Sequence, residues 1–182
     1  MNILNEIDAS WTLFLDRDGV INHEKHADYI KQIDEFMFYD GVLEALQILS
    51  RRFKYLIIVT NQRGIGKGLM THDDLHTIHT MMKVHVLEAG GRIDAIYYAP
   101  ELASDAINRK PNIGMGLQAK NDFPMIDFHK SIMVGNNLSD MEFGKNLNMK
   151  TVFLSTTNPN QAPHPSIDII YPNLLDFAKN IL

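Results

Sequence analysis

Residues 11–18 read WTLFLDRD, and this stretch decides the predicted fold. The run 11–15 is short, apolar and bulky, which indicates a buried β-strand. The strand ends on Asp16 and Asp18, so two carboxylates are delivered at its carboxyl end. Gly19 follows and permits a sharp turn that lets both side chains face one site. This strand end is the first candidate for a functional site.

The same pattern, a short apolar run that stops at polar residues, recurs along the chain. The further strand predictions are residues 55–59, 93–98, 131–134 and 151–154. Helical patterns alternate with them over residues 41–52, 71–89 and 138–146. Strands that alternate with helices predict an α/β fold, in which a parallel sheet carries helices on both faces. Ligands bind such sheets beyond the carboxyl ends of the strands, so the polar residues there are expected to converge.

The length and the connections predict one domain. At 182 residues with 45% hydrophobic residues, the chain is long enough to bury one core. The gap between the first two strands is too short for an inserted cap domain. Prolines crowd residues 159–172, which predicts an extended surface segment before a short final helix over residues 174–182. We therefore expect a single domain over residues 1–182.

Charge and residue usage exclude several classes of protein. The formal net charge of -5 lacks the excess of Lys and Arg typical of nucleic-acid binding, so no nucleic acid partner is expected. No apolar run is long enough to cross a bilayer, and residues 1–8 carry acids where a secretion signal has bases. We therefore expect a cytoplasmic protein with no membrane partner, and a monomer as the default. The absence of cysteine excludes disulfides, thiolate zinc sites and a cysteine nucleophile.

Asp16 and Asp18 are the first candidates for catalysis. Two carboxylates this close repel each other, and without a cation one of them stays protonated, so the pair indicates half of a magnesium site. With the metal present, Asp16 can remain ionised and attack phosphorus, while Asp18 donates a proton to the leaving alcohol. Taken alone, the pair is equally compatible with a strand-end turn closed by a side-chain hydrogen bond.

Three other predicted strand ends carry groups that suit a phosphate. Thr60 offers a hydroxyl, and the glycine-rich segment 61–68 can bring backbone N–H groups to an anion. Arg109 and Lys110 place two cations where phosphoryl oxygens need neutralising. Residues 136–140 add an amide oxygen and a carboxylate. Each motif alone has a structural alternative: a common glycine loop, a solvated basic pair, or the N-terminal cap of a helix.

Together, these residues resemble the haloacid dehalogenase (HAD) superfamily of phosphohydrolases. An acid pair, a hydroxyl, a lysine and an acidic loop close four separate strands in that order. The resemblance implies a Rossmann-like HAD domain and a magnesium cofactor. It also implies that Asp16 becomes an aspartyl-phosphate, that Asp18 acts as acid and then base, and that Thr60 and Lys110 hold the phosphoryl group. The implied magnesium ligands are Asp16, the backbone carbonyl of Asp18, Asn136 and Asp140.

A closer resemblance extends over nearly the whole chain. It is carried by residues 15–22, 59–62, 96–98 and 109–111. These segments are similar to the D-glycero-D-manno-heptose 1,7-bisphosphate phosphatases and the related histidinol-phosphate phosphatases, which lack a cap domain. The resemblance implies that Asn61, Gln62 and Arg109 contact the sugar or a second phosphate. It implies a small phosphorylated metabolite as partner, with a sugar bisphosphate preferred over histidinol phosphate or another metabolite. The alternative outside enzymes is a phosphate-binding homologue with weakened catalysis.

The chain departs from that family at two places. Residues 99–101 read Ala-Pro-Glu and residues 106–108 read Ala-Ile-Asn, where the family binds zinc through cysteine and histidine. We therefore expect no structural zinc. Asn136 stands where the family usually has a metal-binding aspartate. An amide oxygen still coordinates magnesium, but the lost charge is expected to weaken the site.

A histidine cluster offers a competing metal site. His72, His76 and His79 are spaced as on a helix, but no carboxylate accompanies them. Imidazoles need further partners to be held as ligands, so a solvated helix face is the expected role of all three.

Overall fold

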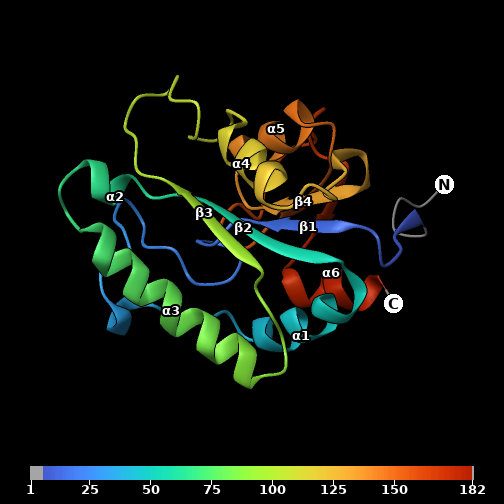
Figure 1. Ribbon diagram of the computed structural model, residues 1–182, viewed down its shortest axis with the longest axis horizontal. Coiled ribbons are helices and arrows are strands. Elements are labelled where there is room, and N and C mark those ends of the chain that lie inside the picture. Colours follow the sequence, from blue (N-terminus) through green and yellow to red (C-terminus); the bar gives the residue numbers. More distant parts are fainter. Residues whose placement is uncertain (1–5, 182) are drawn as a thin grey trace.

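The predicted parallel sheet is confirmed. The structure is a computed structural model that describes residues 6–181. One sheet of six parallel strands has the order β3-β2-β1-β4-β5-β6 (Figure 1). The strands are β1 Thr12–Leu15, β2 Tyr55–Asn61, β3 Ala95–Ala99, β4 Ser131–Gly135, β5 Lys150–Leu154 and β6 Ile169–Tyr171. The chain winds outward from β1 through β2 to β3 and then returns to β4 on the other side. The direction of winding thus reverses between β1 and β4, where sheets of this kind open a crevice for ligands.

Helices cover both faces of the sheet, also as predicted. They are α1 Val42–Arg52, α2 Arg63–Gly66, α3 His72–Glu88, α4 Gly114–Asp122, α5 Leu138–Asn146 and α6 Leu174–Asn180, with short 3-10 helices η2 Ile33–Glu35 and η3 Phe128–Lys130. Figure 1 shows α4 and α5 on one side of the strands and α1, α3 and α6 on the other. Residues 16–54 hold only η2, α1 and loops, so no cap domain is inserted there.

Alternate side chains of each strand supply two separate cores. In β1, Leu13 and Leu15 pack into the core beneath α1, α3 and α6, whereas Phe14 packs with Met115 and Phe143 on the α4 and α5 side. All five side chains are fully buried. Strands that are buried on both faces read as continuous apolar runs, which is why this strand lacks a polar alternation.

Helix α4 and strand β6 were not predicted from the sequence, nor were the short helices α2, η2 and η3. Helix α4 begins with two glycines among its first three residues, which disfavours a helix. It forms because Met115 and Ala119 are buried against the sheet. Strand β6 has three residues within the proline-rich end of the chain, and it extends the sheet beside β5 where we expected only an extended segment.

Some boundaries also differ from the predictions. The segment 61–68, expected as an open loop, contains the single-turn helix α2. The final helix ends at Asn180, and residue 182 lies outside the described residues. Residues 1–5, on which the argument about a secretion signal partly depends, also lie outside them. Within residues 6–181, no helix combines the length and the apolar character that a bilayer span needs.

Candidate active site

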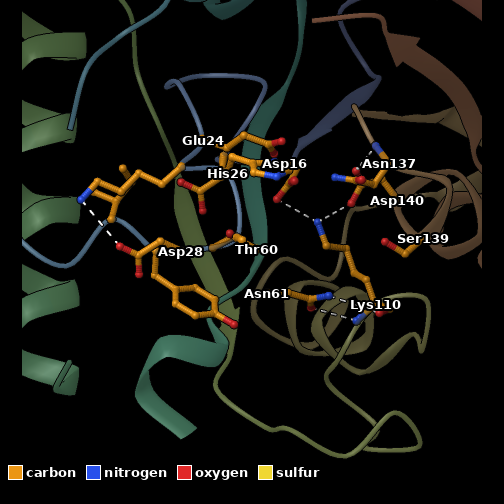
Figure 2. A pocket seen from close by; sticks show the side chains of 15 residues that line it. Asp16, Glu24, His26, Asp28, Thr60, Asn61, Lys110, Asn137, Ser139 and Asp140 are labelled. Carbon is orange, nitrogen blue, oxygen red and sulfur yellow. Dashed lines mark hydrogen bonds and ion pairs between the residues drawn. The ribbon is translucent and has the colours of Figure 1, made fainter. Parts of the chain in front are cut away.

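The polar residues that end the central strands converge on one pocket. Its volume is about 240 Å³, and it lies at the carboxyl ends of β1, β2 and β4. The residues that line it include Asp16, Asp18, Thr60, Asn61, Lys110, Asn137, Ser139 and Asp140, together with residues 24–30 from the loop after β1. Figure 2 shows the side chains of Lys110, Asp16 and Asp140 pointing toward one another from different parts of the chain.

Lys110 is a buried cation held between two carboxylates. Its Nζ lies 2.9 Å from Asp16 Oδ1 and 2.7 Å from Asp140 Oδ1, and it donates to the carbonyl of Val59 at 2.8 Å. Burial alone would lower the pKa of Lys110, but the charges of Asp140 and Asp16 outweigh it and raise this pKa. The ammonium group is therefore charged and fixed beside Asp16.

The pKa of the Asp16 carboxyl group is raised above its ordinary value. Burial is the largest cause that raises its pKa, Lys110 opposes it, and the negative charges of Asp140 and Asp18 raise it further, so that the pKa is about 7 overall. The Asp16 N–H donates to the carbonyl of Val134 at 2.9 Å, which continues the pairing of β1 with β4 and fixes the backbone. A divalent cation at this position favours the ionised form, so the site suits metal binding.

The Asp18 carboxylate accepts hydrogen bonds from three neighbouring side chains. The Arg17 Nη2 donates to both carboxylate oxygens, at 2.8 and 2.9 Å, and Asn22 and Gln62 each donate to one oxygen at 2.9 Å. Burial would raise the pKa of Asp18, but the Arg17 charge and these hydrogen bonds lower it overall. The side chain keeps 25% of its surface exposed and lines the pocket. Asp18 is thus ionised, oriented and accessible.

The residues after β2 support this arrangement. Gln62 is buried, and its Nε2 donates to Asp18 Oδ2 and to Thr60 Oγ1, both at 2.9 Å. Thr60 accepts this bond, which leaves its own O–H for an oxygen in the pocket. Asn61 lines the pocket and clamps the backbone of Lys110 through bonds of 3.0 and 3.2 Å. Gln62 and Arg109 do not line the pocket, so their predicted contacts with substrate stay predictions.

Asn136 carries an oxygen that is suited to a metal. It is fully buried, and its Oδ1 has no hydrogen-bond partner within residues 6–181. Its Nδ2 donates to Thr157 Oγ1 at 2.8 Å and to Glu24 Oε2 at 3.2 Å. Gly19 adopts a φ of +83°, and a Cβ there would lie 2.0 Å from the Asn136 Nδ2. The turn after Asp18 therefore requires glycine, both for its backbone angle and for the close approach of Asn136.

Hard oxygen donors fit magnesium better than a transition metal, but Asn136, unlike Asp16, does not line the pocket, so its role as a metal ligand stays a prediction. Over residues 6–181, no group of three or more His, Cys, Asp or Glu side chains forms a metal cluster. The Asp16 carboxylate and the unpaired Asn136 Oδ1 are hard oxygen donors, and magnesium binds few protein ligands while keeping several waters. Both Asp140 oxygens have protein donors, Lys110 Nζ and the Asn137 N–H at 3.0 Å. Asp140 therefore positions Lys110 and caps α5, and its role as a metal ligand stays a prediction.

The loop that precedes Lys110 is held by side-chain amides. Asn112 Nδ2 donates to the carbonyls of Ser104 and Ala106, both at 3.0 Å, and Asn108 Nδ2 donates to Glu101 Oε1 at 3.1 Å. These bonds connect residues 99–101 with residues 106–108, the two segments that lack the zinc ligands of the related phosphatases. Side-chain hydrogen bonds therefore fix the conformation of the loop that leads to Lys110.

We predict that zinc neither binds this loop nor stabilises the protein. Addition of excess zinc should leave the melting temperature unchanged, because residues 99–112 contain no cysteine or histidine to bind it there. Asn112→Ala should lower the unfolding free energy by about 1–3 kcal/mol, because two carbonyls lose their donor. Asn121→Ala, at an exposed amide in α4, is the control for thermal melting. Stoichiometric uptake of zinc with a higher melting temperature would show the prediction to be wrong.

Comparison with known proteins identifies the family. A family model described as polynucleotide kinase 3 phosphatase matches residues 12–158. A D-glycero-alpha-D-manno-heptose-1,7-bisphosphate 7-phosphatase of Campylobacter jejuni is 40% identical over 142 residues, which cover 78% of this chain and 80% of the relative. The chain belongs to this family of HAD-type phosphatases. A second relative in the family, a D-glycero-beta-D-manno-heptose-1,7-bisphosphate 7-phosphatase of Pasteurella multocida, is 39% identical over 155 residues, 81% of this chain and 83% of the relative.

A solved structure of this phosphatase family has the same fold. It is the D,D-heptose 1,7-bisphosphate phosphatase from B. bronchiseptica complexed with magnesium and phosphate. The TM-score is 0.84 at 25% sequence identity, and the match covers 94% of this chain and 97% of that one. The predicted resemblance and the HAD fold are therefore confirmed.

Some residues around the pocket were not singled out from the sequence. Glu24 does not stand directly after a strand, so the sequence pattern did not single it out. The folded loop after β1 brings it to Asn136. Arg17 did carry a signal, because it stands between two aspartates that share one face. Alternation along the chain predicts that its side chain leaves the backbone on the interior side, where an arginine requires partners, and in the structure Asp18 and His79 are those partners.

Proposed function

We propose that this chain is a magnesium-dependent phosphatase that hydrolyses a sugar bisphosphate such as D-glycero-D-manno-heptose 1,7-bisphosphate through an aspartyl-phosphate on Asp16. The observation that carries the proposal is the position of the Lys110 ammonium, 2.9 Å from Asp16 and 2.7 Å from Asp140 in one pocket. Lysine fixed there neutralises a phosphoryl group next to a nucleophilic carboxylate. The printed names of the relatives, and the magnesium and phosphate in the B. bronchiseptica structure, support the same chemistry.

The reaction proceeds in two displacements. The Asp18 carboxylate is ionised in the free protein, and we propose that it takes up a proton when the negatively charged phosphate binds beside it. The Asp16 carboxylate then forms a bond to phosphorus as the bond to the leaving oxygen breaks, and Asp18 gives that oxygen the proton. Water then attacks phosphorus, Asp18 takes a proton from it, and free phosphate and the Asp16 carboxylate result. Lys110 and the Thr60 hydroxyl hold the phosphoryl oxygens during both steps. Magnesium, when bound by Asp16, the Asp18 carbonyl and Asn136, keeps Asp16 ionised and offsets the phosphoryl charge.

The loop after β1 supports the choice of a small, polar substrate. Lys25, His26 and Tyr29 line the pocket, and we propose that they contact the sugar. The pocket of about 240 Å³ accepts a small metabolite. The net charge of -5 argues against a polynucleotide substrate. A cytoplasmic location and a monomeric state stay predictions from the sequence.

A substrate panel tests the proposal. Purified protein with magnesium is incubated with D-glycero-D-manno-heptose 1,7-bisphosphate, histidinol phosphate and a 3′-phosphorylated oligonucleotide, and released phosphate is measured. We expect the highest kcat/KM with the sugar bisphosphate, release of one phosphate per molecule, and no release with excess EDTA. Faster hydrolysis of either competitor would contradict the proposed substrate. Tight binding of the sugar bisphosphate without release would instead identify a phosphate-binding homologue.

We predict that Asn136→Asp tightens magnesium binding. A carboxylate in place of the amide adds a charge at the unpaired oxygen, and we expect a gain of about 1–3 kcal/mol in binding free energy. Without metal, the new carboxylate faces Glu24, whose oxygen lies 3.2 Å from the present amide nitrogen, so the metal-free variant should melt at a lower temperature. Calorimetric titration with magnesium measures the affinity. Asn160→Asp adds the same charge at an exposed position and should leave the affinity unchanged. Equal or weaker magnesium binding by Asn136→Asp would show that this loop is not the metal site.

A further inference from the structure

His79 is buried, and the predicted solvated face is therefore wrong for this residue. Its exposure is 7%, whereas His72 and His76 on the same helix are exposed. Helix α3 turns Leu75, Ile78, His79 and Met82 toward the sheet. A buried imidazole on an apolar face requires a hydrogen-bond partner, because an unpaired polar group there is costly.

The partner of His79 is the buried Arg17. The Arg17 Nη1 lies 3.0 Å from His79 Nε2, and Arg17 has 0% exposure. Arginine has only donors, so His79 Nε2 is the acceptor and the ring hydrogen is on Nδ1. Burial, and then the Arg17 charge, lower the pKa of His79 to about 3. The imidazole is therefore neutral, as an acceptor must be.

The other edge of the same guanidinium holds Asp18. The Arg17 Nε donates to Asp18 at 3.2 Å, and Nη2 donates to both Asp18 oxygens at 2.8 and 2.9 Å. The remaining nitrogen, Nη1, makes no bond to Asp18 and donates to His79 instead. The Phe36 ring lies 6.0 Å from the guanidinium carbon. Arg17 is thus fixed between a carboxylate that lines the pocket and an imidazole that does not.

We infer that His79 is a positioning residue for the phosphatase reaction, because it locks Arg17 in the orientation in which Arg17 aims Asp18 at the leaving oxygen. The inference rests on the proposed function, in which Asp18 transfers the proton. Neither His79 nor Arg17 lines the pocket, so both act through Asp18. In the proposed reaction Lys110 and Thr60 hold the phosphoryl group, and their hydrogen bonds and ion pairs within residues 6–181 go to groups other than His79. Loss of the imidazole acceptor should therefore change proton transfer and leave substrate binding intact.

Three substitutions separate this role from simple core packing. His79→Leu fills the site with an apolar side chain and removes the acceptor, while His79→Gln provides an acceptor oxygen for Arg17. His76→Leu is the matched control, because His76 is exposed one turn earlier and the imidazole bonded to Arg17 is that of His79. Melting temperatures confirm that each variant is folded at the assay temperature.

We expect kcat of His79→Leu to fall about 10- to 100-fold with KM changed by less than about threefold, because a misplaced catalytic group affects the chemical step. His79→Gln should recover most of kcat, and His76→Leu should match the wild type. The ¹⁵N NMR signal of the Arg17 Nε–H group provides a second readout: it should exchange slowly with water in the wild type and in His79→Gln, and rapidly in His79→Leu.

Two results would overturn the inference. The first is a His79→Leu variant with the kcat and the Arg17 signal of the wild type. The second is an equal loss of kcat in His79→Leu and His79→Gln, since packing alone would then explain the effect. If His79→Leu fails to fold, the comparison of His79→Gln with the wild type still decides. If the wild type releases no phosphate, the proposed function falls, while the NMR comparison still determines whether His79 holds Arg17.

Discussion

Replacing Asp16 with asparagine is expected to reduce the rate of phosphate release by roughly 10⁴-fold or more, because the reaction loses its nucleophile. The amide has nearly the shape of the carboxylate and carries no charge. The pKa of Asp16 is raised to about 7, mainly by burial, so the ionised carboxylate destabilises the folded, metal-free protein at neutral pH. Removing the charge should therefore leave the melting temperature of the metal-free protein unchanged or higher. A folded and inactive variant is the expected result.

Two measurements make the Asp16→Asn experiment decisive. Acid quenching of the wild type during turnover of ³²P-labelled substrate should trap labelled protein, and the variant should trap none, because the aspartyl-phosphate forms only on Asp16. Asp40→Asn is the matched control, since Asp40 is exposed and lies outside the pocket. Its rate should equal that of the wild type. If Asp16→Asn turned over at the wild-type rate, another group would have to be the nucleophile and the proposed mechanism would be wrong.

The sequence was sufficient for the sheet and for the groups at its carboxyl edge, because both depend on local patterns. The run 11–15 and the aspartates that follow it predicted β1 and the pocket, and Thr60 lies at the end of β2, where parallel strands must bring it. Lys110 reaches the same pocket from the loop between β3 and α4. Strand β6 escaped prediction since three residues carry too little periodicity to identify a strand. Helix α4 was not predicted because its two glycines lower the helix propensity, whereas the burial of Met115 and Ala119 that stabilises it is visible only in the fold.

The supporting contacts around the site depend on long-range packing. His79 and Arg17 are 62 residues apart, and Asn136 and Glu24 are 112 apart, so no local pattern links them. For His79 a usable signal was nevertheless present. Leu75, Ile78 and Met82 define an apolar stripe, and His79 falls on it four residues after Leu75, whereas His76 does not. Grouping the histidines by residue type concealed a difference that helical periodicity reveals.

Lys110→Met is expected to weaken both the activity and the fold. The substitution removes the only cation that the structure places within ion-pair distance of Asp16 and Asp140 among residues 6–181. Two buried carboxylates then lie close together without compensation, and we expect the unfolding free energy to fall by about 3–5 kcal/mol. Phosphate release at a temperature where the variant is folded should fall by roughly 10²–10³-fold, because a fixed charge on the phosphoryl oxygens is lost. Denaturant unfolding and the phosphate assay measure the two effects.

The pH dependence identifies the cause of the lost stability. Without Lys110, the pKa of Asp16 in the folded variant should lie further above that of the unfolded chain, because the opposing charge is lost. The folded state then holds more protons than the unfolded state, so stability decreases as the pH rises, and the deficit should be smaller near pH 6 than near pH 8. The double variant Lys110→Met, Asp140→Asn should regain much of the stability, since one carboxylate is removed while an acceptor for the Asn137 N–H remains, and it should stay inactive.

A surface ion pair provides the control for the Lys110 experiment. Lys145 pairs with Asp168 at 2.5 Å and keeps 32% of its side chain exposed, away from the pocket. Lys145→Met should cost at most about 1 kcal/mol and leave phosphate release unchanged, because exposed ion pairs contribute little. A Lys110→Met variant that was as stable and as active as Lys145→Met would mean that the buried lysine holds neither the carboxylates nor the phosphoryl group. The arrangement of Asp16, Lys110 and Asp140 would then be structural packing without a catalytic role.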